Sequence, residues 1–236
     1  MKPAKKAAEM TLKELASYID QSVLKPEFTQ EDIKKYTQEG IDFGCATICI
    51  NPSSLELVSK MVAGTSTGIC VVCDFPFGLS TTESKVNQAE NYLSKYKIAD
   101  LDVVANYGQI RSGNLEYVIN DIKAVAEICH KYGANCKVII ETDALNKQQI
   151  IDGTKCAVAA GADFIKSSTG FYTGGAVVGA TPEVVQTMID AGAGKIKVKG
   201  SGCIRTQEHF FKLIDMGVDR MGIGYRSTPV VLGLKK

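Results

Sequence analysis

The sequence predicts an α/β protein, a (β/α)8 TIM barrel with a short helical extension at its N-terminus. Two observations support this fold: short apolar runs typical of buried strands alternate with longer helical segments, and eight such runs occur without a break in composition. Alternating strands and helices form a parallel sheet, and eight units favour closure into a barrel. The length of 236 residues suits one barrel, so we expect residues 1–236 to form a single domain.

The expected elements follow one another in a regular order. A polar helix is expected at 12–17, before the first strand. The eight strands are expected at 18–22, 46–50, 69–74, 100–105, 137–141, 163–167, 195–199 and 220–224. Between them lie helical patterns such as 114–132, in which apolar residues recur every three or four positions, as on the buried face of a helix.

The overall composition gives no sign of a nucleic acid or membrane partner. The formal net charge is +1, and hydrophobic residues make up 45% of the chain, as in a globular protein with a large core. No apolar run approaches the ~20 residues that span a bilayer, and the first ten residues lack the apolar stretch of a signal peptide. We therefore expect a cytoplasmic protein.

The cysteines and histidines do not suggest a metal site or a cofactor. Eight cysteines are scattered through predicted strands and helices, where reduced core thiols are expected. Cys70 and Cys73 are three positions apart in a strand and therefore point to opposite faces. The two histidines, His130 and His209, lie in helix-like segments, so neither a histidine triad nor a histidine metal cluster is expected.

Two lysines at the ends of predicted strands are the strongest chemical signal. Lys166 ends one strand and Lys199 ends the next. In the segment 195–199 the lysines alternate with apolar residues, which places Lys195, Lys197 and Lys199 on the face that looks into a barrel. If Lys166 and Lys199 face each other, charge repulsion and desolvation leave one amine neutral and nucleophilic near pH 7, as a Schiff-base enzyme requires. The alternative is that each lysine lies on an edge or extends its ammonium group to solvent.

Acidic residues lie on the other predicted strands. Asp102 is flanked by Leu101 and Val103, so alternation places it on the inner face, where a lysine partner would be favourable. A carboxylate beside two lysines can relay protons during carbon–carbon cleavage, although a purely structural ion pair is the alternative. Other acidic candidates are Asp20, Glu141 and Asp143.

Glycine clusters follow three late strands, at 170–175, 200–202 and 222–224. Loops after the last strands of such barrels often bind phosphate through backbone N–H groups, and glycine lets the chain approach an anion closely. A phosphorylated substrate is therefore expected, with simple tight turns as the alternative for any one cluster.

At these residues the chain resembles the 2-deoxyribose-5-phosphate aldolases, class I enzymes on the barrel fold. The resemblance spans most of the chain and is carried by the segments 20–26, 72–76 with 81–83, 101–104, 139–142, 166–171 with 174–176, and 198–202 with 204–206. It implies a lyase that reversibly cleaves 2-deoxy-D-ribose 5-phosphate to acetaldehyde and D-glyceraldehyde 3-phosphate without a metal. It also implies that Lys166 forms the Schiff base, that Lys199 favours the neutral form of Lys166, and that Asp102 transfers protons with Lys199 and a water.

The expected partner is a phosphorylated aldehyde, and a homodimer is expected only from the family. The substrate-binding residues are expected to be Asp20, Ser22, Thr169, Gly170, Gly174, Gly175, Ser201, Gly202, Gly224 and Arg226.

The chain departs from the family pattern at several positions near this site: Gln21, Asp74, Asp143, Lys197, Cys203, Tyr225 and Arg226. Lys197 would add a third ammonium group to the inner face, which Asp74, Glu141 or Asp143 would compensate. Three interpretations follow. The first is an ordinary deoxyribose-phosphate aldolase in which Arg226 binds the phosphate. The second is a related Schiff-base aldolase with an altered substrate, and the third is a barrel that binds a sugar phosphate without catalysis.

Overall fold

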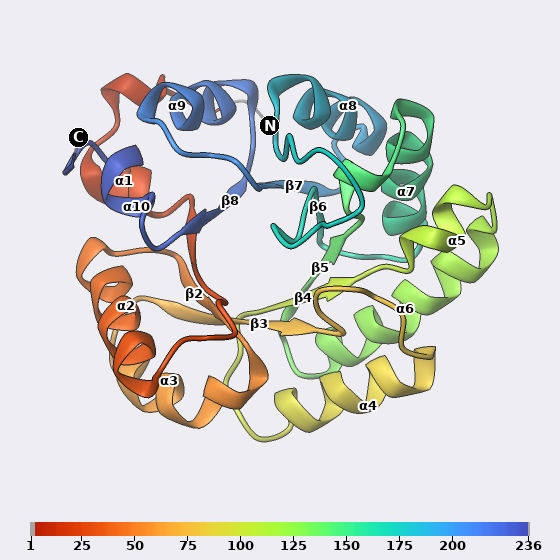
Figure 1. The fold of residues 1–236 in the computed structure, drawn as a ribbon, viewed down its shortest axis with the longest axis horizontal. Coiled ribbons are helices and arrows are strands. Elements are labelled where there is room, and N and C mark those ends of the chain that lie inside the picture. The colour runs from red at the N-terminus through yellow and green to blue at the C-terminus, as the bar shows by residue number, and fades with distance from the viewer. Residues whose placement is uncertain (1–2, 236) are drawn as a thin grey trace.

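A computed structural model, which describes residues 3–235, confirms the predicted fold. Within these residues eight parallel strands close into a barrel in sequence order, with β8 paired to β1, and helices surround the strands (Figure 1). The strands are β1 Ile19–Val23, β2 Thr47–Ile50, β3 Gly68–Cys73, β4 Asp100–Val104, β5 Asn135–Ile139, β6 Phe164–Lys166, β7 Lys197–Ser201 and β8 Arg220–Gly224.

The helices form an outer ring and an N-terminal extension (Figure 1). They are α1 Leu12–Ala16, α2 Gln30–Phe43, α3 Leu55–Val62, α4 Thr82–Leu93, α5 Tyr107–Arg111, α6 Leu115–Lys131, α7 Lys147–Ala159, α8 Pro182–Gly192, α9 Gln207–Met216 and α10 Thr228–Val231, with 3-10 turns η1 Ala7–Glu9, η2 Pro52–Ser54 and η3 Thr142–Ala144. The extension docks on α9, where Ala7 N donates to Asp215 Oδ1 at 2.8 Å. None of the described helices is both long and apolar enough to cross a bilayer.

Local sequence signals explain where the helices begin and end. In α2 the Thr29 side chain accepts from Asp32 N, and the Asp32 carboxylate accepts from Thr29 N, which is the reciprocal capping box. The helix ends at Gly44, whose φ of 75° is left-handed, a conformation that glycine adopts without strain. These caps fix the lengths of the connections to the strands.

The strand register separates an outer apolar core from a polar interior. Side chains alternate along each strand, so every second residue faces the helices and the others face the barrel axis. Most buried apolar residues belong to the outer cluster, whereas Leu24, Cys49, Cys70 and Val72 form a small inner one. Cys73 lies in the outer cluster and Cys70 in the inner one, as the spacing of three predicted. The remaining inner space holds ionisable side chains.

Two strands are shifted from the prediction by two residues at both ends. The seventh strand begins at Lys197 rather than 195, because Ala193 and Gly194 are left-handed and Lys195 N donates to Gly192 O at 2.8 Å, closing the turn after α8. The fifth strand ends at Ile139 rather than 141, because Glu141 has a φ of 52° and cannot continue a strand.

Candidate active site

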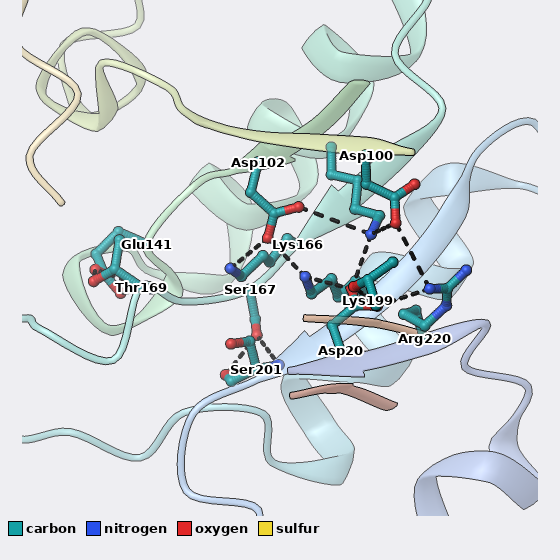
Figure 2. A network of polar contacts seen from close by, with 12 residues as sticks. Asp20, Asp100, Asp102, Glu141, Lys166, Ser167, Thr169, Lys199, Ser201 and Arg220 are labelled. Carbon is teal, nitrogen blue, oxygen red and sulfur yellow. Dashed lines mark hydrogen bonds and ion pairs between the residues drawn. The ribbon is translucent and has the colours of Figure 1, made fainter. Parts of the chain in front are cut away.

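Lys166 and Lys199 lie side by side and share one carboxylate. The pairing of β6 with β7 places them directly opposite each other. Asp102 Oδ2, from β4, lies 2.7 Å from Lys166 Nζ and 2.6 Å from Lys199 Nζ. Figure 2 shows both lysines beside this carboxylate. All three side chains are buried, yet Lys166 retains 2% exposure while Lys199 has none. Of the two lysines, only Lys166 therefore keeps any contact with solvent.

A second layer of charges lies beneath this trio. Asp20 Oδ2 lies 2.6 Å from Lys199 Nζ and 2.8 Å from Lys137 Nζ, and Asp20 Oδ1 accepts from Arg220 at 2.7 Å. Asp100 pairs with Lys137 and lies 3.6 Å from Arg220 (Figure 2). Asp20 is fully buried and contacts Lys199 from below.

Sequence reasoning missed Lys137, which is fully buried in the interior. Its neighbours Cys136 and Val138 face the outer core, so Lys137 shows the same alternation that identified Asp102. This alternation in the sequence could have identified Lys137 as an inner residue.

Lys197, by contrast, does not add a charge to the buried interior. It lies at the start of β7, is exposed, and holds its Nζ 5.2 Å from the ring centroid of Phe164. Lys197 shares the inner face of β7 with Lys199, but the third ammonium group of the buried network belongs to Lys137, and the carboxylates that compensate it are Asp20 and Asp100.

The network determines the ionisation of its members. Burial alone would raise the pKa of Asp20, but Lys137, Lys199 and Arg220 outweigh it and hold that pKa well below its usual range. For Asp102, the opposing effect of burial is outweighed by Lys166 and Lys199, which lower its pKa. Burial would likewise lower the pKa of Lys199, but Asp102 and Asp20 raise it well above its usual value. Lys199 is thus held as a permanent cation beside Lys166.

The buried cluster carries more positive than negative groups. Among the described residues it contains three carboxylates, of Asp20, Asp100 and Asp102, and four cationic side chains, of Lys137, Lys166, Lys199 and Arg220. Within that set, Lys166 contacts one carboxylate, whereas Lys199, Lys137 and Arg220 each contact at least two. Lys166 is therefore the cation of this cluster with the fewest carboxylate contacts.

A cavity of about 250 Å³ opens at the carboxyl ends of β1, β6, β7 and β8. It brings together the predicted residues Ser22, Thr169, Gly170, Ser201, Gly202 and Gly224. It also contains two cationic residues that were not assigned to the site, Lys25 and Arg205. Positive charge beside flexible glycine loops suits a phosphate group.

Gly222 keeps the floor of this cavity open. A Cβ there would lie 2.8 Å from Ser201 Oγ and in ordinary contact with Lys199 Cε at 3.6 Å, so a side chain at this position would displace the Ser201 hydroxyl group.

Four residues expected to bind substrate do not line this cavity: Asp20, Gly174, Gly175 and Arg226. Gly174 and Gly175 lie in the exposed part of the loop after β6. Arg226 is exposed, and its guanidinium group lies 5.2 Å from the ring centroid of Tyr225. The Tyr225 ring packs on Tyr36, with centroids 4.0 Å apart, so although Tyr225 borders the cavity, much of its ring is used in aromatic packing.

The inner cysteines do not form a convincing metal site. Cys49, Cys70 and Asp102 offer ligand atoms within 4.8 Å of one another. Asp102 Oδ2, however, is already contacted by two ammonium groups, and their positive charge opposes binding of a cation.

A parallel barrel with a buried, carboxylate-linked lysine pair at the strand ends is typical of enzymes that use an amine as nucleophile. The comparisons with known proteins define the family more narrowly. The sequence matches the family described as DeoC/LacD family aldolase over residues 15–229. The chain belongs to this family of aldolases, which confirms the resemblance seen in the sequence.

Curated relatives and solved structures agree with that assignment. The deoxyribose-phosphate aldolase of Clostridium kluyveri is 40% identical over 213 residues, which is 90% of this chain and 95% of the relative. The deoxyribose-phosphate aldolase of Thermococcus kodakarensis is also 40% identical, over 90% of this chain and 94% of its own. A deoxyribose phosphate aldolase structure from Aeropyrum pernix, described as tetrameric, superimposes with a TM-score of 0.84 at 28% identity, covering 94% of this chain and 91% of that one.

Proposed function

We propose that this protein is a class I aldolase that reversibly cleaves 2-deoxy-D-ribose 5-phosphate to acetaldehyde and D-glyceraldehyde 3-phosphate through a Schiff base on Lys166. The observation that carries the proposal is the pair of lysines on Asp102, with 2.7 Å and 2.6 Å contacts. The relatives named for this activity support the choice of substrate.

The proposed reaction begins with attack of Lys166 Nζ on the C1 aldehyde carbon of the open-chain sugar. Loss of water gives an iminium ion. A base removes the proton of the C3 hydroxyl, the C2–C3 bond breaks, and its electron pair flows to the iminium as an enamine forms. D-glyceraldehyde 3-phosphate leaves; protonation of the enamine at C2 and hydrolysis then release acetaldehyde and free Lys166.

Asp102 and Lys199 are proposed to move the protons. Asp102 Oδ1 is buried and has no hydrogen-bond partner among the described residues, so it can accept from a water or from a substrate hydroxyl. Lys199, which the carboxylates hold protonated, can donate to that water and stabilises negative charge that develops beside it.

The phosphate is proposed to bind in the cavity beside Gly170, Gly202 and Gly224, with charge supplied by Lys25 and Arg205. Ser22, Thr169 and Ser201 provide hydroxyl groups in the same space. Arg226 stays a candidate for this role only if its side chain leaves the Tyr225 ring.

Cleavage of 2-deoxyribose 5-phosphate, coupled to detection of glyceraldehyde 3-phosphate, tests the proposal. We expect turnover in the native protein and a loss of at least about a hundredfold in Lys166→Ala, because the nucleophile is removed. Treatment with acetaldehyde and borohydride should add mass at Lys166, and the matched control Lys197→Ala should retain both properties.

Other outcomes separate the alternatives. Trapping at Lys166 without cleavage of this sugar would indicate an aldolase with another substrate. No imine with any aldehyde would contradict the aldolase and favour a non-catalytic sugar-phosphate barrel. A homodimer and a cytoplasmic location also remain predictions, to be checked by light scattering and cell fractionation.

A further inference from the structure

The connection between β6 and α8 borders the proposed substrate cavity at both of its ends. It runs from Lys166 to Thr181, the N-cap of α8. Its first residues, Thr169 to Phe171, line the cavity. Its last residues reach Gly202, another cavity residue, to which Ala180 N donates at 3.1 Å. The middle, residues 173–178, is exposed, so the shape of the loop depends on what holds its ends.

One carboxylate connects the two ends of this loop. Asp143 Oδ1 accepts from Val178 N at 2.8 Å and from Gly179 N at 2.9 Å. Asp143 Oδ2 lies 3.3 Å from Ser168 Oγ, which donates to it. Hydrogen bonds to a charged acceptor are stronger than those between neutral groups. Asp143 thereby links residue 168 to residues 178 and 179 across the base of the loop.

The far end of the loop fits closely against the cavity wall. Gly179 has a φ of 65°, and a Cβ at this position would lie 2.4 Å from Gly202 O. Only glycine permits this approach. Because Asp143 binds Gly179 N directly, a shift of this contact would move the backbone that packs on Gly202.

A neighbouring residue, Glu141, holds the first end of the loop. The Thr169 hydroxyl donates to Glu141 Oε2 (Figure 2), and Phe171 N donates to Thr169 Oγ1 at 3.0 Å. The Phe171 ring then meets Phe75 edge-on, with centroids 5.4 Å apart. Glu141 therefore positions the start of the loop, whereas Asp143 alone spans both ends among the described side-chain contacts.

We propose that Asp143 is a positioning residue for the phosphorylated substrate. It holds the β6–α8 loop in the shape that binds this substrate, and it takes no part in the chemistry at Lys166. Without it, the substrate would have to order the loop on binding, which weakens affinity. The kinetic part of this proposal rests on the proposed function; the effect on the loop does not.

Two substitutions of different severity test the proposal. In Asp143→Ala the acceptors for Ser168, Val178 and Gly179 are removed. In Asp143→Asn, Oδ1 still accepts from Val178 N and Gly179 N, so this conservative variant should still hold the loop in place. Asp42→Asn is the matched control, since Asp42 is exposed on α2 and accepts from Gln38 of the same helix.

Three measurements are made on each full-length variant: hydrogen exchange of residues 168–180, KM and kcat for 2-deoxyribose 5-phosphate, and borohydride trapping of acetaldehyde on Lys166. In Asp143→Ala we expect faster hydrogen exchange confined to the loop. KM should rise about tenfold, which corresponds to a loss of about 1.4 kcal/mol in the free energy of binding. The kcat should stay within about twofold of the native value. Borohydride trapping of acetaldehyde on Lys166 should be unchanged, because acetaldehyde has no phosphate group for the loop to help bind. Asp143→Asn should have loop exchange rates, a KM and a kcat close to those of the native protein.

Two results would overturn the proposal. One is loop exchange in Asp143→Ala that equals that of the native protein. The other is a loss of kcat and of imine trapping with KM unchanged, which would give Asp143 a chemical role. If the native protein does not cleave this sugar, the proposed function fails, and loop exchange still decides whether Asp143 holds the loop. If Asp143→Ala does not fold, Asp143→Ser replaces it in all three measurements.

Discussion

At the scale of single residues, the interior depends on carboxylates that each bind several cations. Asp20 contacts Lys137, Lys199 and Arg220 at 2.8, 2.6 and 2.7 Å and accepts from Thr47 Oγ1 at 2.7 Å. Asp102 binds the two upper lysines in the same way. Each carboxylate replaces the water that these cations would lose on burial, so removing one leaves several charges without a partner.

Asp20→Asn should therefore change the pH dependence of stability. The folded pKa of Asp20 lies below the unfolded value of about 3.9, so its stabilising contribution is complete above that pH and is lost as the pH falls toward the folded pKa. We expect the free energy of unfolding of the variant to be lower by about 3–5 kcal/mol at pH 7, and the deficit to shrink below about pH 4. Urea unfolding at pH 7, 5 and 3 measures this. Equal deficits at pH 7 and 3 would contradict the assignment, and Asp42→Asn serves as the exposed control.

At the scale of elements, a second buried ion cluster lies outside the barrel and holds the loop after β3. Lys85, on α4, is fully buried; its Nζ donates to Asp121 Oδ2 of α6 at 2.6 Å and to Val104 O of β4 at 3.1 Å. Asp74, which begins the loop with a φ of 49°, lies 3.7 Å from Lys85 and accepts from Ser80 N at 2.9 Å. The cluster thus fixes the segment that carries Phe75 toward Phe171.

Lys85→Met should destabilise the protein strongly, because the variant leaves the carboxylate of Asp121 buried without its cation. We expect a loss of about 3–5 kcal/mol in the free energy of unfolding, measured by urea denaturation at pH 7. The matched control is Lys60→Met, which removes an exposed ion pair with Glu56 and should cause no resolvable change. Equal stability of Lys85→Met and the native protein would show that Asp121 finds another partner.

The local sequence predicted that Lys166, Lys199 and Asp102 face the barrel interior, because alternation within a strand is a local signal. The long-range contacts were not predictable in this way. Asp143 contacts backbone N–H groups 35 and 36 residues away, and no spacing in the chain indicates such a pairing. Gly174 and Gly175 were expected at the phosphate because they follow a strand, but the path of the loop leaves them exposed. That path is set by its end contacts and not by glycine content.

At the scale of the whole molecule, the ring of strands joins the first and last elements. β1 pairs with both β2 and β8, so no strand of the described barrel is an edge. Barrel closure was predictable from the number of strand-and-helix units, whereas the two-residue shifts of β5 and β7 depended on left-handed residues that the sequence pattern did not reveal. The expectation of a single domain remains a prediction.

A single domain should unfold in one cooperative step. We expect tyrosine fluorescence and far-UV circular dichroism to give the same urea midpoint, because loss of any strand opens the ring. The chain has no tryptophan and nine tyrosines, which makes tyrosine the natural optical probe. Two separate transitions in the native protein would instead indicate two folding units.

The two apolar clusters have a consequence for engineering this protein. The outer cluster, between strands and helices, contains most of the buried apolar residues, while the inner one among the described residues consists of Leu24, Cys49, Cys70 and Val72 beside the charged groups. The residues that contribute most to stability thus lie between the strands and the helices, whereas the charged groups of the candidate active site lie inside the ring of strands. Substitutions in the outer cluster that fill space or strengthen helices can raise heat tolerance while the interior of the ring, and with it the turnover of substrate, stays as it is.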